Sequence, residues 1–346
     1  MSDTIAPRLL AWYDTHGRRH LPWQAPRTPY RVWVSEIMLQ QTQVATVIGY
    51  FERFVAALPD LATLAAAPPH RVLALWSGLG YYSRARNLQR AAQLCLERHD
   101  GELPRDIDAL AALPGIGRST AGAILAQAHG LRVPILDGNV KRVLTRWHGL
   151  PGWPGASAVA RTLWQHADAH TPPARVADYT QAIMDLGATV CVRAAPRCEA
   201  CPLADDCVAR RDGLTALLPE RKPAKPAPTR STCMLLLCRE DGRVLLQRRP
   251  PTGVWAGLWS LPEGETAEAA LRLARSLGLR ATPFAALPGF VHAFSHYRLA
   301  VTPLRSRVSA ADALGDHPDL HWADRPALAQ LGLPAPVRRL LNETLE

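Results

Sequence analysis

The stretch Cys191-Val-Arg-Ala-Ala-Pro-Arg-Cys198-Glu-Ala-Cys201-Pro-Leu-Ala-Asp-Asp-Cys207 places four cysteines with six, two and five residues between them. The N-terminus has no apolar stretch long enough for a signal peptide and no apolar run could cross a membrane, so a reducing, cytoplasmic setting is expected. In that setting the cluster indicates a metal site rather than disulfides. A single Cys-x2-Cys with one cysteine on each side favours an iron–sulfur cluster, with zinc as the alternative.

Length and charge point to two domains and a polyanionic partner. The chain has 346 residues, which is long for one core. Lys and Arg number 40 against 30 Asp and Glu, a formal net charge of +10. With 48% hydrophobic and 20% charged residues the chain is globular rather than disordered. The excess of cations favours nucleic acid, although many basic proteins bind none.

Residues 1–212 have apolar residues at helical spacing and no alternating strand pattern, so this domain is predicted to be mostly α-helical. Residues 213–231 contain four prolines and interleaved cations, which predicts an extended linker. Residues 232–346 read as an α+β domain that opens with a β-hairpin turning at Asp241-Gly242. Further strands are expected near Val291 and over 297–304, and a helix over 265–277. In the first domain the expected helices are 32–50, 71–75, 84–98, 107–113, 119–128 and 140–147.

Residues 107–128 contain Leu113-Pro-Gly-Ile-Gly-Arg-Ser-Thr-Ala-Gly122 between two helical segments. Gly115 and Gly117 let backbone N–H groups face outward at a helix N-terminus, which suits a phosphate. Such a helix–hairpin–helix holds a nucleic-acid backbone without reading bases. A tight turn without a ligand is the alternative.

Two carboxylates are candidate catalytic groups. Glu36 lies in an apolar helix, where burial would keep it protonated as a general acid requires. Asp137 precedes a helix, and N-capping alone would explain it. For Glu36 an ion pair with an arginine is equally compatible with the sequence. The sequence does not show whether the two residues meet.

Together the hairpin, Asp137 and the four-cysteine loop resemble the endonuclease III superfamily of DNA glycosylases. Ser35-Glu-Ile-Met-Leu-Gln-Gln-Thr-Gln-Val44 and Gly78-Leu-Gly-Tyr-Tyr-Ser-Arg-Ala-Arg-Asn87 are similar to MutY-type adenine DNA glycosylases. The resemblance covers nearly the whole chain. It implies a 4Fe–4S cluster in the loop 191–207, held by Cys191, Cys198, Cys201 and Cys207.

The resemblance also implies roles for individual residues. Glu36 would protonate N7 of adenine, and Asp137 would stabilise the oxocarbenium-like sugar. Ser119 stands where lyase relatives have a Schiff-base lysine, so a monofunctional enzyme is expected, with nearby Lys141 as a backbone contact. The flipped base requires wedge and pocket residues. The residues that match these positions are Gln41 and Tyr81 for the wedge, and Gln181, Trp23 and Gln24 for the adenine pocket.

In the second domain, Gly253-Val-Trp-Ala-Gly-Leu-Trp-Ser-Leu-Pro-Glu-Gly-Glu265 resembles the entry to a Nudix fold. A Nudix hydrolase needs a cluster of carboxylates for Mg²⁺ on the next helix, and residues 271–278 contain none. The resemblance implies a domain that recognises 8-oxoguanine, with Phe294 stacking on the base, Ser295 hydrogen-bonding to it and His296 in support.

The sequence thus predicts a monofunctional adenine DNA glycosylase that acts on double-stranded DNA carrying adenine opposite 8-oxoguanine or guanine. It is expected to be a cytoplasmic monomer, nucleoid-associated if the source is bacterial, without a membrane partner. A glycosylase/lyase for oxidised pyrimidines is opposed by Ser119 and by the second domain. A non-catalytic damage sensor is opposed by the presence of both carboxylates.

Overall fold

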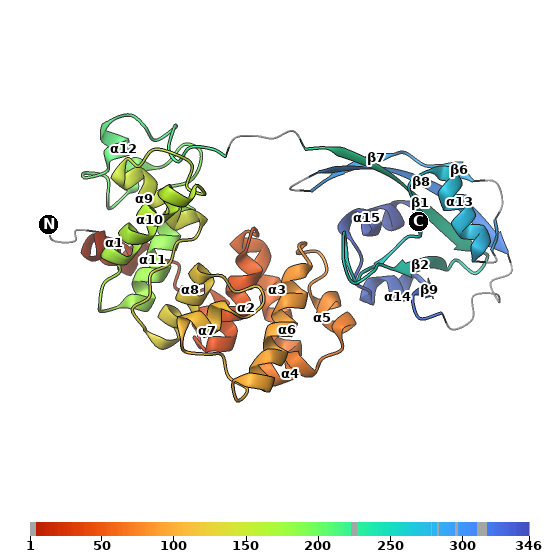
Figure 1. Ribbon diagram of the computed structural model, residues 1–346, viewed down its shortest axis with the longest axis horizontal. Coiled ribbons are helices and arrows are strands. Elements are labelled where there is room, and N and C mark those ends of the chain that lie inside the picture. Colours follow the sequence, from red (N-terminus) through yellow and green to blue (C-terminus); the bar gives the residue numbers. More distant parts are fainter. Residues whose placement is uncertain are drawn as a thin grey trace. The chain divides into compact units, whose positions relative to one another are not determined.

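The computed structural model describes residues 5–222, 227–277, 279–281, 284–294, 297–309 and 317–345. The chain divides into two compact units, one formed by residues 1–66 and 87–223, the other by residues 67–86 and 224–346 (Figure 1). The sequence boundary was expected at the linker alone. The structure instead groups the segment 67–86 with the C-terminal residues.

The first unit is helical throughout its described residues, as predicted. Its sequence explains where the helices end: Asp137 caps the N-terminus of α9, and Gly149 ends α9 in the left-handed conformation with φ of 63°. Residues 67–86 of the second unit contain α5 (Pro69–Leu75) and the start of α6 (Ser83–Arg98). The other helices are α1 (Ile5–His16), η1 (Pro22–Gln24), α2 (Pro29–Leu39), α3 (Val44–Ala57), α4 (Leu61–Ala66), α7 (Ile107–Ala111), α8 (Arg118–His129), α9 (Gly138–His148), α10 (Ser157–His170), α11 (Val176–Thr189), η2 (Cys198–Ala200) and α12 (Val208–Arg211).

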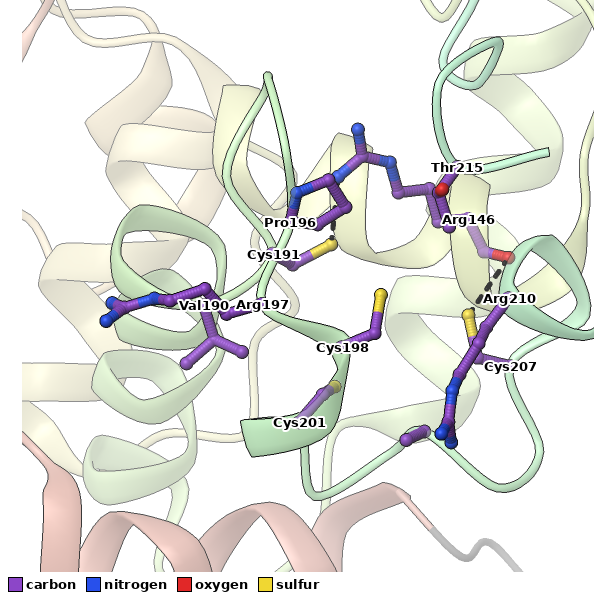
Figure 2. Close-up of a pocket in the computed structure, with 11 residues that line it drawn as sticks. Arg146, Val190, Cys191, Pro196, Arg197, Cys198, Cys201, Cys207, Arg210 and Thr215 are labelled. Atoms are coloured by element: carbon purple, nitrogen blue, oxygen red, sulfur yellow. Dashed lines mark hydrogen bonds between the residues drawn. The ribbon is translucent and has the colours of Figure 1, made fainter. Parts of the chain in front are cut away.

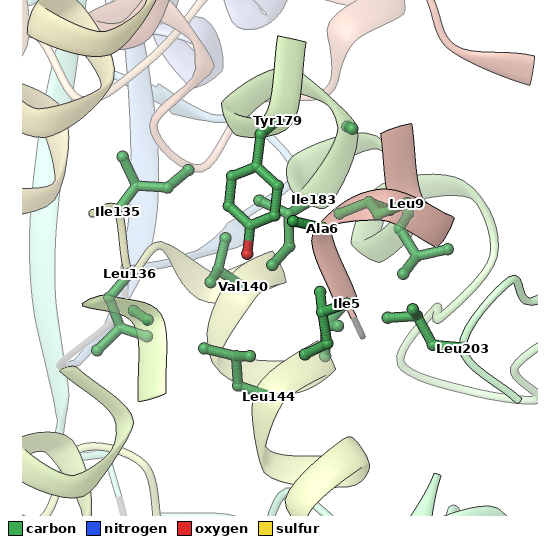
Figure 3. Packing of buried hydrophobic residues seen from close by; sticks show 14 of the residues in the cluster. Ile5, Ala6, Leu9, Ile135, Leu136, Val140, Leu144, Tyr179, Ile183 and Leu203 are labelled. Carbon is green, nitrogen blue, oxygen red and sulfur yellow. The ribbon is translucent and has the colours of Figure 1, made fainter. Parts of the chain in front are cut away.

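One buried cluster joins the N-terminal helix to helices far along the chain (Figure 3). Ile5 and Leu9 of α1 pack with Val140 and Leu144 of α9, and Leu203 reaches the same core from the cysteine loop. Each such aliphatic side chain contributes about 1.5–3 kcal/mol when fully buried. This core fixes the position of α9. The helix has the carboxylate of Asp137 at its N-terminal end and lies against the cysteine loop toward its C-terminal end.

The helix expected over 32–50 is two helices. α2 ends at Leu39 and α3 begins at Val44, with Gln41 between them at a φ of 58°. A non-glycine residue in the left-handed region cannot continue a right-handed helix. The apolar spacing of both segments hid this break, because each one alone has helical periodicity.

The second unit contains one mixed sheet among its described strands. Its order is β3-β2-β1-β8-β5, with β4 beside β1, β6 and β7 beside β8, and β9 beside β2. The central pair β1 and β8 is parallel, in register from Thr229 opposite Arg298 to Arg239 opposite Val308. The strands are β1 (Thr229–Arg239), β2 (Val244–Arg248), β3 (Trp259–Ser260), β4 (Glu263–Gly264), β5 (Arg280–Ala281), β6 (Ala285–Ala286), β7 (Phe290–Ala293), β8 (Arg298–Ser309) and β9 (Leu320–Ala323).

Both faces of this sheet are covered by helices. Along β1, Met234 and Leu236 belong to one core and Leu235 and Leu237 to the other, as the two-residue period of a strand requires. α13 (Ala267–Ser276) covers the second core, and α14 (Arg325–Gln330) and α15 (Ala335–Thr344) cover the first. The predicted hairpin at Asp241-Gly242, the strands at Val291 and 298–304 and the helix near 265–277 are all present.

The predicted linker is shorter in the structure. Leu218 is buried in the helical unit, where its carbonyl accepts from Arg146 Nε at 2.8 Å. Glu220 Oε1 accepts from the backbone N–H of Gly152 at 2.7 Å, and β1 already begins at Thr229. Residues 213–222 therefore complete the cysteine-containing end of the helical unit. No helix in the described part of the chain is both long and apolar enough to span a bilayer.

Candidate active site

Glu36 projects from α2, a helix most of whose other side chains are buried. The helix begins where Thr28 Oγ1 accepts from the Arg31 N–H at 3.3 Å and Pro29 occupies its first position. Gln127 Nε2 of α8 donates to Glu36 Oε1 at 3.1 Å. Burial, and then the charge of Asp137, raise the pKa of Glu36 to about 7, against the smaller lowering effect of Gln127.

Asp137 is held by its neighbours in the chain. Its Oδ1 accepts from the Val140 N–H at 2.8 Å, and its Oδ2 accepts from Asn139 Nδ2 at 3.1 Å. Burial raises the pKa of Asp137, while these donors act in the opposite direction. The N-cap reading of Asp137 is therefore correct, and the structure also places it within electrostatic reach of Glu36.

The two carboxyl groups have different environments, and this separates their roles. Asp137 receives backbone and amide donors that favour a carboxylate, whereas Glu36 receives one amide and faces the negative charge of Asp137. Adjacent like charges in a buried site resist ionising together. Burial raises the pKa of both groups, so we expect the pair to keep a proton at pH values at which exposed carboxyl groups have lost theirs.

Ser119 helps to position the chain segment that leads to Asp137. It lies on the first turn of α8, where its Oγ accepts from the Leu136 N–H at 2.9 Å. Gly122 of the same helix lies so close to the preceding segment that an added Cβ would be 2.6 Å from the Pro134 carbonyl oxygen. The residue types of α8 therefore set the path of the chain just before Asp137.

The turn between α7 and α8 has the expected form. Gly115 adopts a φ of 80°, and Gly117 caps α8. Both glycines are exposed while Ile116 between them is buried. Lys141 is half-buried on the first turn of α9, and its backbone N–H bonds the carbonyl of Asp137 at 2.9 Å.

The two residues expected to act as wedges share a local conformation. Gln41 has a φ of 58° and Tyr81 a φ of 47°, and both side chains are exposed, Tyr81 by 50%. Gln41 lies in the helical unit and Tyr81 in segment 67–86. Non-glycine residues in the left-handed region cost about 1–2 kcal/mol and concentrate at functional sites.

The expected pocket residues are buried. Trp23 packs edge-on against Phe51 with ring centroids 5.4 Å apart. Gln24 is 9% exposed, and its Nε2 donor has no hydrogen-bond partner among the described residues. Gln181 is 3% exposed and donates to Asp185 Oδ1 at 2.8 Å, which Arg18 Nη2 also binds at 2.7 Å. The Gln181 amide is thus held by Asp185, whereas Nε2 of Gln24 is a buried donor without a partner among the described residues.

The four cysteines gather around one pocket, into which their sulfur atoms point (Figure 2). They come from the end of α11, η2 and the loop before α12. Burial, with a smaller contribution from the other three cysteines, raises the pKa of the Cys201 thiol to about 11. Four thiolates here would therefore need a cationic group among them. Cys95, Cys233 and Cys238, predicted to be ordinary packing residues, lie apart from the loop sequence, and Cys95 and Cys238 are buried.

Two arginines of α9 border this loop. Arg146 is 2% exposed, and it donates to Cys191 Sγ at 3.4 Å and to the Val192 carbonyl at 2.7 Å. A buried guanidinium beside sulfur fits a cluster whose thiolates leave a net negative charge. Arg142 donates to the Cys191 carbonyl at 2.6 Å and to Asn139 Oδ1 at 2.9 Å. Since Asn139 also binds Asp137, one hydrogen-bonded chain joins the loop to the carboxylate.

In the α+β unit, Phe294 lies among aromatic rings. It stacks on Tyr297 at 4.7 Å and meets His292 edge-on at 4.6 Å. Ser295 and His296 lie outside the described residues. The predicted lack of a carboxylate cluster agrees with α13, whose one acidic residue, Glu268, is exposed in the first turn.

Comparisons with known proteins agree with this architecture. The model of the HhH-GPD superfamily base excision DNA repair proteins matches residues 34–168, and that of the NUDIX domain matches residues 233–343. Adenine DNA glycosylase of Buchnera aphidicola subsp. Acyrthosiphon pisum is 34% identical over 335 residues, 96% of this chain and 95% of that protein. The chain belongs to the adenine DNA glycosylase family.

Further relatives support this membership. Human adenine DNA glycosylase is 36% identical and aligns with 84% of this chain and 64% of its own length. A solved structure of a thermostable thymine-DNA glycosylase superposes with a TM-score of 0.55 at 26% identity, over 60% of this chain and 95% of its own. The predicted fold class and family resemblance are confirmed.

Several residues of this family member's site were not found from its sequence. Gln127, Asn139, Arg142 and Arg146 hold the carboxylates and the cysteine loop, yet nothing was predicted for them. The spacing of Arg142 and Arg146 by four residues was a usable signal, because it puts both on one face of α9. Gln127 had no such signal, since its partner Glu36 is 91 positions away.

Proposed function

We propose that this chain is a monofunctional glycosylase that hydrolyses the N-glycosidic bond of adenine mispaired with 8-oxoguanine or guanine. The observation that supports it best is the pairing of Glu36, whose pKa is raised to about 7, with Asp137, whose oxygens accept from the Val140 N–H and the Asn139 amide. All proposed reaction groups lie in one chain, so the proposal is for a monomer acting on DNA in the cytoplasm, at the nucleoid if the source is bacterial.

The carboxyl groups divide the reaction between them. Adenine leaves poorly as an anion, and Glu36 removes this obstacle by donating its proton to N7 of the base. Gln127 holds Oε1, so the other carboxyl oxygen of Glu36 is the one available to carry the proton. Asp137 then faces the developing positive charge of the sugar and stabilises it. Water completes the reaction and leaves an abasic site.

The remaining residues would present the base and hold the duplex. Gly115 and Gly117 leave the N-terminus of α8 open to a phosphate, and Lys141 adds a cation beside Asp137. Gln41 and Tyr81 would fill the stack that the flipped adenine leaves. The buried donor Gln24 Nε2 suits a ring nitrogen of that adenine, and Trp23 and Gln181 would line the same pocket.

The cysteine loop fits a 4Fe–4S cluster held by Cys191, Cys198, Cys201 and Cys207. When bound, the cluster would cross-link the loop and supply the negative charge that offsets Arg146. Ser119 cannot form a Schiff base, so no lyase step is proposed. Phe294 would stack on 8-oxoguanine, with Ser295 and His296 beside it, in a domain without the acidic cluster of a hydrolase.

The test is the variant Glu36→Gln, which keeps size and hydrogen bonding but removes the proton. Single-turnover excision of adenine opposite 8-oxoguanine, measured as alkali-dependent strand breaks, should fall by about 10²–10⁴-fold. Duplex binding should remain within about threefold. Excision within a few-fold of wild type would disprove the assignment of Glu36. Strand breaks without alkali in the wild type would disprove the monofunctional reaction.

A further inference from the structure

Three histidines form a cluster apart from the catalytic pair and the cysteine pocket. His148 ends α9, and His166 and His170 occupy the last turns of α10, one helical turn apart. One ring nitrogen from each lies within 4.8 Å of the others. His148 Nε2 and His170 Nε2 are 3.0 Å apart, and the ring of His166 stacks on His148 with centroids 3.5 Å apart.

The surroundings of the cluster favour a cation. α9 ends at His148 and α10 ends at His170, so the negative ends of two helix dipoles converge there. Trp147 packs edge-on against both of these rings, at 4.6 Å and 5.3 Å.

The helix ends that carry these rings are themselves well fixed. Gly149 ends α9 with its N–H on the Thr145 and Arg146 carbonyls, and an added Cβ there would lie 2.3 Å from Val208 Cγ1. At the end of α10, Arg132 donates to the Thr171 carbonyl at 3.0 Å and to Asp168 Oδ1 at 3.0 Å. Two fixed helix ends bring the three imidazoles together at little further cost in chain entropy.

We propose that His148, His166 and His170 bind one Zn²⁺ ion, which clamps the C-terminal end of α9 to α10. Three imidazoles with a water in the fourth position are a known tetrahedral donor set for zinc, and imidazole suits zinc better than Mg²⁺ or Ca²⁺. Two nitrogens on a tetrahedral zinc ion lie about 3.3 Å apart, for Zn–N bonds of about 2.0–2.1 Å. The His148–His170 pair is already near this separation, and His166 would turn out of its stack to become the third ligand.

Without the metal, the same rings form a hydrogen bond between His148 and His170, in which one Nε2 donates and the other accepts. Binding therefore exchanges one hydrogen bond and one ring stack for three Zn–N bonds. The clamp would act on the helix that carries Asp137 at its other end, but it contributes no ligand or proton to the base-excision reaction.

Zinc affinity of the full-length protein tests the proposal. The protein is purified with its cysteine loop loaded, freed of loosely bound metal and titrated with Zn²⁺ against a chromophoric chelator. One equivalent should bind at micromolar Kd or tighter. Each of His148→Gln, His166→Gln and His170→Gln should weaken this binding at least about 100-fold. His70→Gln, which changes an exposed histidine elsewhere, should leave it within about twofold.

Two wild-type measurements make the test independent of variant folding. Zinc X-ray absorption should show nitrogen at about 2.0–2.1 Å, whereas sulfur at about 2.3 Å would place the metal in the cysteine loop and overturn the proposal. Zinc at 100 times its Kd should raise the unfolding midpoint of the helical unit by about 5 °C. The absence of a one-equivalent site, or wild-type zinc affinity in all three histidine variants, would also overturn it.

Discussion

The two units of this chain differ in where their acidic and aromatic side chains lie. In the helical unit Glu36 and Asp137 are withdrawn from water, and each has partners that fix its oxygens. The α+β unit matches the NUDIX domain model over residues 233–343, and the one acidic residue of its helix α13 is exposed. Its distinctive groups are aromatic rings around Phe294. We propose that the partnered carboxylates of the helical unit provide the chemistry and that the aromatic rings around Phe294 provide recognition.

The comparison predicts that a change in α9 affects the reaction itself. Arg142→Met should lower single-turnover excision about 10–100-fold, because it removes the bonds to the Cys191 carbonyl and Asn139 that steady Asp137. Excision opposite guanine and opposite 8-oxoguanine should fall equally. The measurement is the single-turnover rate on both mispairs, with iron per protein recorded for each sample.

Arg239→Met in the α+β unit is the matched control. Arg239 pairs with Asp241 at 2.6 Å at the tip of a surface hairpin, so its loss should change neither rate by more than about twofold. Loss of iron together with loss of activity in Arg142→Met would mean that Arg142 acts by holding the cysteine loop and not by positioning Asp137. Unchanged excision would remove the link between the loop and the carboxylate.

A change in the α+β unit is expected to alter the preference between the two mispairs and not the excision reaction itself. Phe294→Ala in the full chain should reduce the preference for 8-oxoguanine over guanine by about tenfold, since stacking on a base contributes about 1–3 kcal/mol. Excision opposite guanine should stay near the wild-type rate. Phe290→Ala on the same hairpin removes a ring that packs against the core of this unit, so it controls for stability. An equal loss of preference in both variants would indicate damaged folding rather than lost stacking.

The units also differ in how much of them could be predicted from sequence. Strand alternation and the Asp241-Gly242 turn located the hairpin because those signals are local. In the helical unit, Asp137 could be identified as a cap, but its pairing with Glu36 depends on the packing of α2, α8, α9 and α11. The break at Gln41 depends on backbone conformation that apolar periodicity does not report.

The other features that could not be predicted from the sequence depend on contacts between residues far apart in the chain. Gln127 and Arg146 are ordinary helical residues in sequence, and only folding gives them Glu36 and Cys191 as partners. Residues 213–222 were predicted to be a linker from their composition, because the sequence does not show that Leu218 and Glu220 meet α9 and the loop after it. The prolines that suggested a linker lie mostly beyond this segment, which contains only Pro219 and has turns over residues 215–217.

Ser119→Lys tests whether the helical unit could also perform lyase chemistry. The amine should give a borohydride-trapped adduct with DNA, yet adenine excision should fall about tenfold, because Leu136 loses its acceptor next to Asp137. Ser119→Ala, which loses the acceptor without gaining an amine, should show the same fall and no adduct. A trapped adduct in the wild type, at Lys141 for example, would contradict the monofunctional reaction. No adduct in Ser119→Lys would mean that this position does not reach the sugar.

The smallest expected effect is on the free energy of unfolding, which is lowered by burying the proposed catalytic acid Glu36. The pKa of Glu36 rises from 4.5 when exposed to about 7 in the folded protein, so between these values the folded state binds more protons than the unfolded state. The free energy of unfolding should therefore fall as pH rises through this interval. Glu36→Gln removes the penalty and should be more stable than wild type at pH 8, by about 1–3 kcal/mol.

At about pH 3.5 and below, Glu36 is almost fully protonated in both states, so the variant and wild type should have similar stability. Glu97→Gln, at an exposed residue paired with Arg90, should show no comparable gain at pH 8. Urea unfolding of the helical unit at about pH 3.5 and pH 8 measures both differences. If Glu36→Gln gave no gain at pH 8, the folded protein would not hold Glu36 in a costly environment. The proposed source of its catalytic proton would then be lost, because burial and the charge of Asp137 are what keep Glu36 protonated.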